Sequence, residues 1–221
     1  MMMIAENLKS IKESLPKECT LIAVSKYKTS EEIMEAYAAG HRDFGENRIQ
    51  ELVEKQAQLP GDIRWHMIGH IQTNKIKYFA SFVHLVHGVD RRKVIVELSK
   101  QAVKDNVDIN CLLQIHIARE DSKFGLDESE CLALCEEISQ GVFPRIQCRG
   151  LMGMATFTDK AEIIKAEFDD LKKLYDNIAK KYPHWIWDTL SMGMSGDYKI
   201  AIDAGSNMVR IGSAIFGARS T

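Results

Sequence analysis

The stretch Leu21-Ile22-Ala23-Val24-Ser25-Lys26-Tyr27-Lys28 joins an unbroken apolar run to a lysine. A short run that is apolar at successive positions is typical of a strand in a parallel sheet, because helices cover both faces of such a sheet. In a strand over residues 20–26, Ile22, Val24 and Lys26 would point to the same side. We therefore expect Lys26 to project from the carboxyl end of an interior strand.

A lysine at such a place is suited to nucleophilic chemistry. Partial desolvation lowers the pKa of an ammonium group, and the neutral amine condenses with an aldehyde. The alternative is that the side chain of Lys26 reaches solvent from the strand end and has no chemical role. The apolar run alone does not choose between these two interpretations.

The same strand-like pattern recurs along the whole chain, separated by helical patterns. The strand candidates lie near residues 20–26, 42–45, 64–68, 83–87, 110–117, 146–152, 186–191 and 208–212. The clearest helical patterns are a leading helix from Ile4 to Leu15 and segments from Ser30 to Ala39 (capped by Ser30), Arg91 to Lys104 and Lys160 to Lys181. Eight such alternations are the count of a (β/α)8 TIM barrel, although a doubly wound open sheet alternates similarly. We predict an α/β fold of the barrel type with an additional N-terminal helix. Because no linker-like segment interrupts the pattern, one domain should span residues 1–221.

Composition excludes several classes of function. The 221 residues hold 29 Lys plus Arg and 31 Asp plus Glu, a formal charge of −2, which indicates neither a nucleic-acid partner nor an anionic membrane. No apolar run approaches the roughly 18 residues of a membrane span, and the start of the chain lacks a secretory signal, so we expect a cytoplasmic protein. Five scattered cysteines indicate reduced thiols rather than disulfides.

Two segments near the end of the chain have the composition of a phosphate site. They are Ser191-Met192-Gly193-Met194-Ser195-Gly196-Asp197 and Val209-Arg210-Ile211-Gly212-Ser213-Ala214. Glycines and small residues before a helix let backbone N–H groups approach a phosphate. Barrels commonly bind phosphate after the seventh and eighth strands, and these segments follow the seventh and eighth strand candidates. Turns use the same residues, so each loop alone is weak evidence.

Six motifs together resemble the pyridoxal phosphate homeostasis proteins, single-domain relatives of the alanine racemase N-terminal domain. They are Ala23-Val24-Ser25-Lys26, Phe44-Gly45-Glu46-Asn47, His66 to Lys75 (HMIGHIQTNK), Gly150-Leu151-Met152-Gly153-Met154, Leu190 to Ser195 (LSMGMS) and Val209-Arg210-Ile211-Gly212. The resemblance spans nearly the whole chain, and the motifs occur in the family's order.

The resemblance implies a cofactor and a set of residues that hold it. Pyridoxal 5'-phosphate (PLP) would be held as an imine, a Schiff base, on Lys26. Ser195, Gly212 and Ser213 would hold its phosphate, Asn47 would lie beside the ring, Arg210 would face the pyridine nitrogen, and Met154 and Met194 are candidates to touch the cofactor. Lys28 and Lys123 match further lysines of the family, near the cofactor or its exit route.

The resemblance also bears on catalysis. Alanine racemase completes its site with a second domain that carries a tyrosine base, and this sequence stops at Thr221. Racemisation needs two acid/base groups, and an arginine at the ring nitrogen makes the cofactor a poorer electron sink. We therefore predict a non-catalytic, monomeric carrier and buffer of PLP that supplies PLP-dependent apoenzymes. The alternative is a small PLP-dependent amino-acid racemase.

Other candidate sites have simpler explanations. His66 and His70 are four residues apart, but Gly69 interrupts them and no Glu follows His66, so a helical zinc motif is not indicated. We expect His84 and His87 to be structural, and Cys131 and Cys135 to pack in the core. No metal site is predicted.

Overall fold

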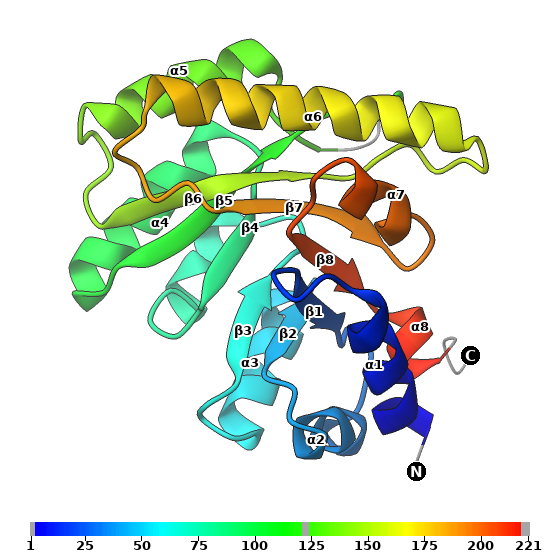
Figure 1. Cartoon of the computed structure of the whole chain (residues 1–221). Coiled ribbons are helices and arrows are strands. Elements are labelled where there is room, and N and C mark those ends of the chain that lie inside the picture. The colour runs from blue at the N-terminus through cyan, green and yellow to red at the C-terminus, as the bar shows by residue number, and fades with distance from the viewer. Residues whose placement is uncertain (1–2, 121–123, 218–221) are drawn as a thin grey trace.

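The computed structural model describes residues 3–120 and 124–217, and its strands form one closed parallel barrel (Figure 1). Each strand pairs with its neighbours in chain order, and β1 closes the barrel against β8, with Leu21 opposite Val209 and Ile22 opposite Arg210. The strands are β1 (Thr20–Val24), β2 (Asp43–Glu46), β3 (Arg64–Met67), β4 (Leu85–Val89), β5 (Ile109–Ile115), β6 (Ile146–Gly153), β7 (Thr189–Met194) and β8 (Met208–Ile211). The predicted barrel is confirmed, and the open sheet is not formed.

Helices lie outside the barrel, and one precedes it. They are α1 (Met3–Ser14), α2 (Ser30–Ala38), α3 (Ile49–Gln58), the 3₁₀ helix η1 (Thr73–Tyr78), α4 (Arg92–Asp105), α5 (Glu128–Ser139), α6 (Ala161–Lys181), α7 (Tyr198–Asp203) and α8 (Ser213–Phe216). Helix α1 lies beside α8 (Figure 1), where the Asn7 side chain donates a hydrogen bond to the Ile215 carbonyl at 3.1 Å. The predicted N-terminal helix is therefore confirmed, and it packs on the last element of the barrel.

Some local predictions were wrong. The seventh strand was placed at residues 186–191, but β7 begins at Thr189 and continues through Met194. The apolar segment before it packs on α6 instead, because the Trp187 indole N–H donates to the Tyr175 carbonyl and the Tyr175 hydroxyl to the Trp187 carbonyl. Helix α2 is capped by Thr29 in a reciprocal capping box with Glu32, not by Ser30.

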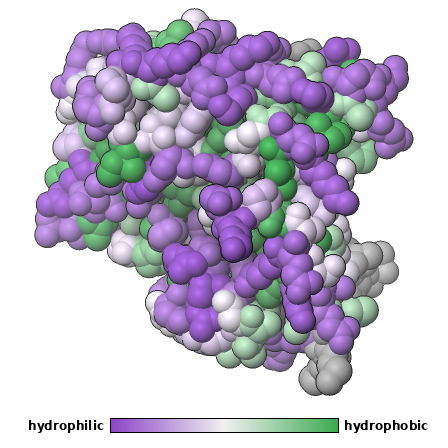
Figure 2. Space-filling model, viewed as in Figure 1, coloured by the Kyte–Doolittle hydropathy of each residue, from purple (hydrophilic) through white to green (hydrophobic). Residues whose placement is uncertain are grey.

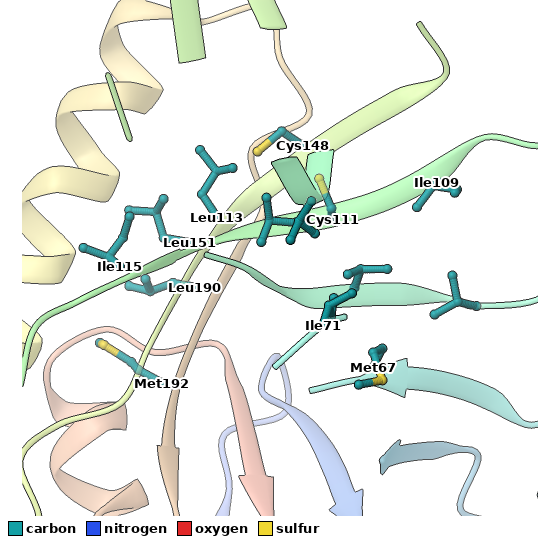
Figure 3. Close-up of a cluster of buried hydrophobic side chains, with 14 of the residues drawn as sticks. Met67, Ile71, Ile109, Cys111, Leu113, Ile115, Cys148, Leu151, Leu190 and Met192 are labelled. Carbon is teal, nitrogen blue, oxygen red and sulfur yellow. The ribbon is translucent and has the colours of Figure 1, made fainter. Parts of the chain in front are cut away.

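The hydrophobic core has two parts. The larger part lies between the barrel and its helices; Figure 3 shows Leu113, Leu151 and Leu190 from adjacent strands pointing into it, with Cys111 and Cys148 nearby. Cys131 and Cys135 are buried in the same cluster, as expected. The smaller part comprises five side chains, from β1, β4, β5, β6 and β8: Ile22, Leu85, Leu112, Met152 and Met208. Alternate residues of these strands point inward, so this cluster fills part of the barrel interior.

The outer surface is largely polar. Figure 2 shows a mostly hydrophilic face, including the outer side of α6, whose apolar side chains Ile164, Phe168 and Leu171 are buried on its inner side. Among the described residues, none of the helices combines the length and the apolar character that crossing a bilayer requires.

Candidate functional site

A cavity of about 440 Å³ opens at the carboxyl end of the barrel strands. All eight residues that the sequence marked as candidate cofactor contacts line it: Lys26, Asn47, Met154, Met194, Ser195, Arg210, Gly212 and Ser213. They come from the ends of β1, β2, β6, β7 and β8 and from the loops that follow. Because the carboxyl ends of parallel strands meet at one mouth of a barrel, segments from opposite ends of the sequence contribute to one site.

Lys26 lies in a turn, two residues beyond the end of β1, rather than in the strand as predicted. Tyr27 has φ of 63°, a left-handed conformation that costs energy for a residue with a side chain. Its backbone N–H donates to Glu51 at 2.8 Å, which holds the chain in this conformation. Lys26 is half-buried and lines the cavity.

A buried ion pair supports the turn from below. The Lys55 ammonium donates to Glu46 and to the Ser25 carbonyl, both at 2.8 Å, and the Ser25 hydroxyl donates to Glu46 at 2.6 Å. Burial raises the pKa of Glu46, although the charge of Lys55 opposes that rise. The residue that precedes Lys26 is thus fixed through both its carbonyl and its hydroxyl. No sequence pattern indicates this arrangement, because Lys55 has the sequence surroundings of an ordinary helical surface residue.

On the side of β1 away from β2, β8 and its neighbour β7 present small polar groups to the cavity. The Gly212 backbone N–H donates to the Ser195 hydroxyl at 3.3 Å, and Ser213 begins α8 directly afterwards. A Cβ atom added at Gly212 would lie 3.2 Å from the Val24 carbonyl oxygen and 3.3 Å from the Val24 Cβ. The glycine thus lets β8 approach β1 closely. The predicted helix after Gly212 is present, but with four residues it contributes little dipole.

Arg210 is the buried cation of the cavity. Its Nη1 donates to the Ser191 hydroxyl at 2.5 Å and its Nη2 to the Gly153 carbonyl at 3.0 Å. Burial lowers the pKa of Arg210 to about 10, with the charge of Asp197 acting in the opposite direction. The guanidinium is therefore still charged at neutral pH.

His70 lines the cavity. The sequence places it in a family motif that follows a strand candidate, and considers it individually only as a zinc ligand. In the structure its ring stacks on Phe124 at 4.0 Å between centroids. Its Nδ1 donates to Asp90 at 2.7 Å. Its position three residues after the end of β3 puts it at the active mouth of the barrel.

Lys28 and Lys123 are the two further lysines that match the family. Lys28 lines the cavity and donates to Glu32 at 3.0 Å and to the Phe216 carbonyl at 3.1 Å, so it links α2 to α8. Lys123 lies outside the described residues.

At the opposite mouth, three potential metal ligands converge. The ligand atoms of Asp43, His66 and His84 lie within 4.8 Å of one another. However, Arg64 donates to both carboxylate oxygens of Asp43, at 2.6 and 2.5 Å. The negative charge is thus already compensated by a guanidinium, so the absence of a metal site stays our prediction. His87 of β4, expected to be structural, is buried and hydrogen-bonded to His66 of β3.

Comparisons with known proteins agree with this geometry. The family model of the alanine racemase N-terminal domain matches residues 2–220. The pyridoxal phosphate homeostasis protein of Vibrio alginolyticus is 42% identical over 209 residues, covering 92% of this chain and 88% of that protein. PipY of Synechococcus elongatus, solved without PLP, superposes with a TM-score of 0.92 at 35% identity over 97% of this chain and 100% of its own. Its PLP-bound structure gives a TM-score of 0.87 at 34% identity and the same coverage.

An alanine racemase of Clostridium difficile shares the fold, with a TM-score of 0.79 at 14% identity. The match covers all of this chain and 58% of the racemase. The match to the family model over almost the whole sequence, together with relatives above 30% identity, establishes the family. This chain belongs to the pyridoxal phosphate homeostasis proteins, which are built on the alanine racemase N-terminal domain.

Proposed function

We propose that this protein binds PLP in the cavity at the carboxyl mouth of the barrel and serves as its carrier and buffer. The observation that carries the proposal is the convergence of three kinds of group on one cavity: the Lys26 amine, the small donors of Ser195, Gly212 and Ser213, and the buried cation Arg210. The relatives named above as homeostasis proteins, and PipY with PLP bound, support it.

The donor set fits the cofactor at both ends. The hydroxyls of Ser195 and Ser213 and the backbone N–H of Gly212 can donate hydrogen bonds to a phosphate dianion. Such charge-assisted hydrogen bonds are stronger than those between neutral groups. At the other end, the Lys26 amine is the group that condenses with an aldehyde. PLP, when bound, supplies that aldehyde and a pyridine ring able to withdraw electrons. Arg210, which keeps its protons, disfavours a protonated ring nitrogen and so weakens this withdrawal.

The proposed role is storage and delivery without turnover. Two features support it: the relatives are named as homeostasis proteins, and Arg210 weakens the electron sink. We further propose that PLP-dependent apoenzymes receive the cofactor, and that the protein acts as a cytoplasmic monomer.

One observation favours the second candidate, a small racemase. His70, held by Asp90, is an acid/base group in the same cavity as Lys26, so two such groups are present. The racemase candidate requires amino-acid racemisation above the rate of free PLP, and loss of that activity in His70→Gln. We expect no activity above that background.

The test of PLP binding is direct. The purified protein mixed with PLP should acquire visible absorbance, and borohydride reduction followed by peptide mapping should place the pyridoxyl group on Lys26. Lys26→Ala should fold normally but lose the label. Lys17→Ala should keep it, because Lys17 is an exposed lysine that precedes the amino end of β1 and does not line the cavity. Labelling chiefly at Lys28, or label retained in Lys26→Ala, would overturn the assignment.

A further inference from the structure

A chain of four hydrogen bonds crosses the barrel from the cavity to its opposite mouth. Arg210 donates to Ser191 at 2.5 Å, and Ser191 lies 3.2 Å from Nδ1 of His87. His87 Nε2 is 3.1 Å from His66 Nδ1, and His66 Nε2 is 3.2 Å from Asp43. The chain therefore joins β8, β7, β4, β3 and β2 in turn. All five side chains are buried.

The two ends of the chain fix its direction. A guanidinium can only donate, and an ionised carboxylate can only accept. Asp43 is ionised: burial raises the pKa of its carboxyl, but the hydrogen bonds from Arg64 and His66 and the charge of Arg64 outweigh burial and hold that pKa well below its usual range. Burial lowers the pKa of both His66 and His87, so both imidazoles are neutral and each has one donor and one acceptor nitrogen.

With both ends fixed, only one arrangement of protons satisfies every bond. His66 carries its proton on Nε2 and donates to Asp43, so its Nδ1 must accept from Nε2–H of His87. Nδ1 of His87 must then accept the hydroxyl proton of Ser191. The Ser191 oxygen is left as the acceptor for Arg210. Each group is thus oriented by the next one along the chain, and the last is held by Arg64.

We infer that Asp43, His66, His87 and Ser191 are positioning residues that hold the Arg210 guanidinium at the wall of the cofactor cavity. The inference rests on the proposed function, because it names the residues that tune that site. A long guanidinium side chain needs fixed acceptors to keep one orientation. Arg210 has two, the Gly153 carbonyl and the Ser191 hydroxyl, and only the hydroxyl can rotate. The chain removes that freedom, so a change at Asp43 should reach the cofactor without touching it.

The first test uses the protein without cofactor. Nitrogen-15 spectra of labelled imidazoles, assigned with His66→Gln and His87→Gln, should show both rings neutral with the proton on Nε2 at pH 7.5. A proton on Nδ1 of either ring, or a charged ring, would refute the inferred arrangement of protons along the four hydrogen bonds. This readout does not depend on PLP, so its failure is distinct from a failure of the proposed function.

The second test compares substitutions at the two ends. Ser191→Ala and Asp43→Asn should each weaken PLP binding about tenfold, the scale of one hydrogen bond to a charged group, and shift the visible band of the bound cofactor. Ser191→Thr keeps the hydroxyl and should retain the native spectrum. Asp62→Asn is the matched control. Asp62 is an exposed carboxylate at the same mouth of the barrel as Asp43, but it pairs with Arg42 and takes no part in the chain of hydrogen bonds.

A merely structural role would lower stability but leave the band of the remaining holoprotein unmoved. Native affinity and an unshifted band in folded Ser191→Ala would therefore refute the positioning role. If Asp43→Asn does not fold, the Ser191 pair decides the question. If the native protein itself takes up no PLP, the proposed function has failed. The nitrogen-15 measurement of the imidazole tautomers then decides whether the four hydrogen bonds form as inferred.

Discussion

Replacing Lys55 with Met should destabilise the protein strongly, because it removes one partner of a buried ion pair. Glu46 is fully buried, and Lys55 donates to it, to the Ser25 carbonyl and to Glu51 at 2.8, 2.8 and 3.4 Å. Removing one partner of such a pair typically costs about 3–5 kcal/mol, since it leaves an uncompensated charge. We expect a loss of about that size in the free energy of unfolding at pH 8.

The measurement is urea unfolding followed by circular dichroism. Lys9→Met is the matched control: its ion pair with Glu13 is 3.9 Å long between two largely exposed side chains, so it should change stability little. Glu46→Gln combined with Lys55→Met should recover much of the loss, because the stranded charge is gone. The Lys55→Met deficit should also shrink from pH 8 to pH 5. Glu46 without its cation has a still higher pKa, so the folded state takes up the proton and is stabilised as pH falls.

Two results would refute this reasoning. A deficit for Lys55→Met below about 1 kcal/mol would mean that the ion pair does not carry the stability assigned to it. A double variant no more stable than the single one would mean that the stranded Glu46 charge is not the cause. The same unfolding curves therefore test both the size of the effect and its origin.

Three further outcomes are expected. Burial lowers the pKa of His41 from 6.5 to about 4, so the unfolded chain takes up a proton at a higher pH than the folded protein does. By pH 5 this difference lowers the free energy of unfolding by roughly 2 kcal/mol. His41→Gln should therefore reduce the loss of stability that urea unfolding measures between pH 7 and pH 5. Gly150→Ala should prevent correct pairing of β6 with β7, since the added Cβ would lie 1.7 Å from the Thr189 carbonyl oxygen; a thermal unfolding temperature like that of the native protein would contradict this. Ser195→Ala should weaken PLP binding about tenfold in a spectral titration but leave affinity for unphosphorylated pyridoxal nearly unchanged, and equal losses for both ligands would place the phosphate elsewhere.

Gly212 is a poorer probe of the phosphate than its sequence context indicates. The loop composition suggests that a side chain there would push the backbone away from an anion. In the structure the added Cβ would instead meet Val24, two residues before Lys26. Gly212→Val would therefore disturb the amine and the phosphate side together, because β8 lies directly against β1.

The sequence by itself, through its alternating pattern together with its resemblance to a known family, determined the barrel and most of the cavity wall. Short apolar runs alternate with amphipathic segments, and that order admits few topologies because crossovers between parallel strands have one hand. Once the barrel is assumed, any polar residue just after a strand must lie at the same mouth, so Lys26, Asn47, Ser195 and Ser213 could be grouped before any contact was known.

Only the tertiary structure decided which buried polar residues pair with one another. Lys55, His66, His87 and Ser191 look like surface or isolated residues in the sequence, because their partners lie on other strands and helices. The direction of a side chain beyond a strand end was also undetermined: Lys26 directly precedes the left-handed Tyr27, whose conformation depends on its hydrogen bond to Glu51. Periodicity reports which face a residue occupies, whereas pairing and proton position depend on distances across the barrel that no local pattern encodes.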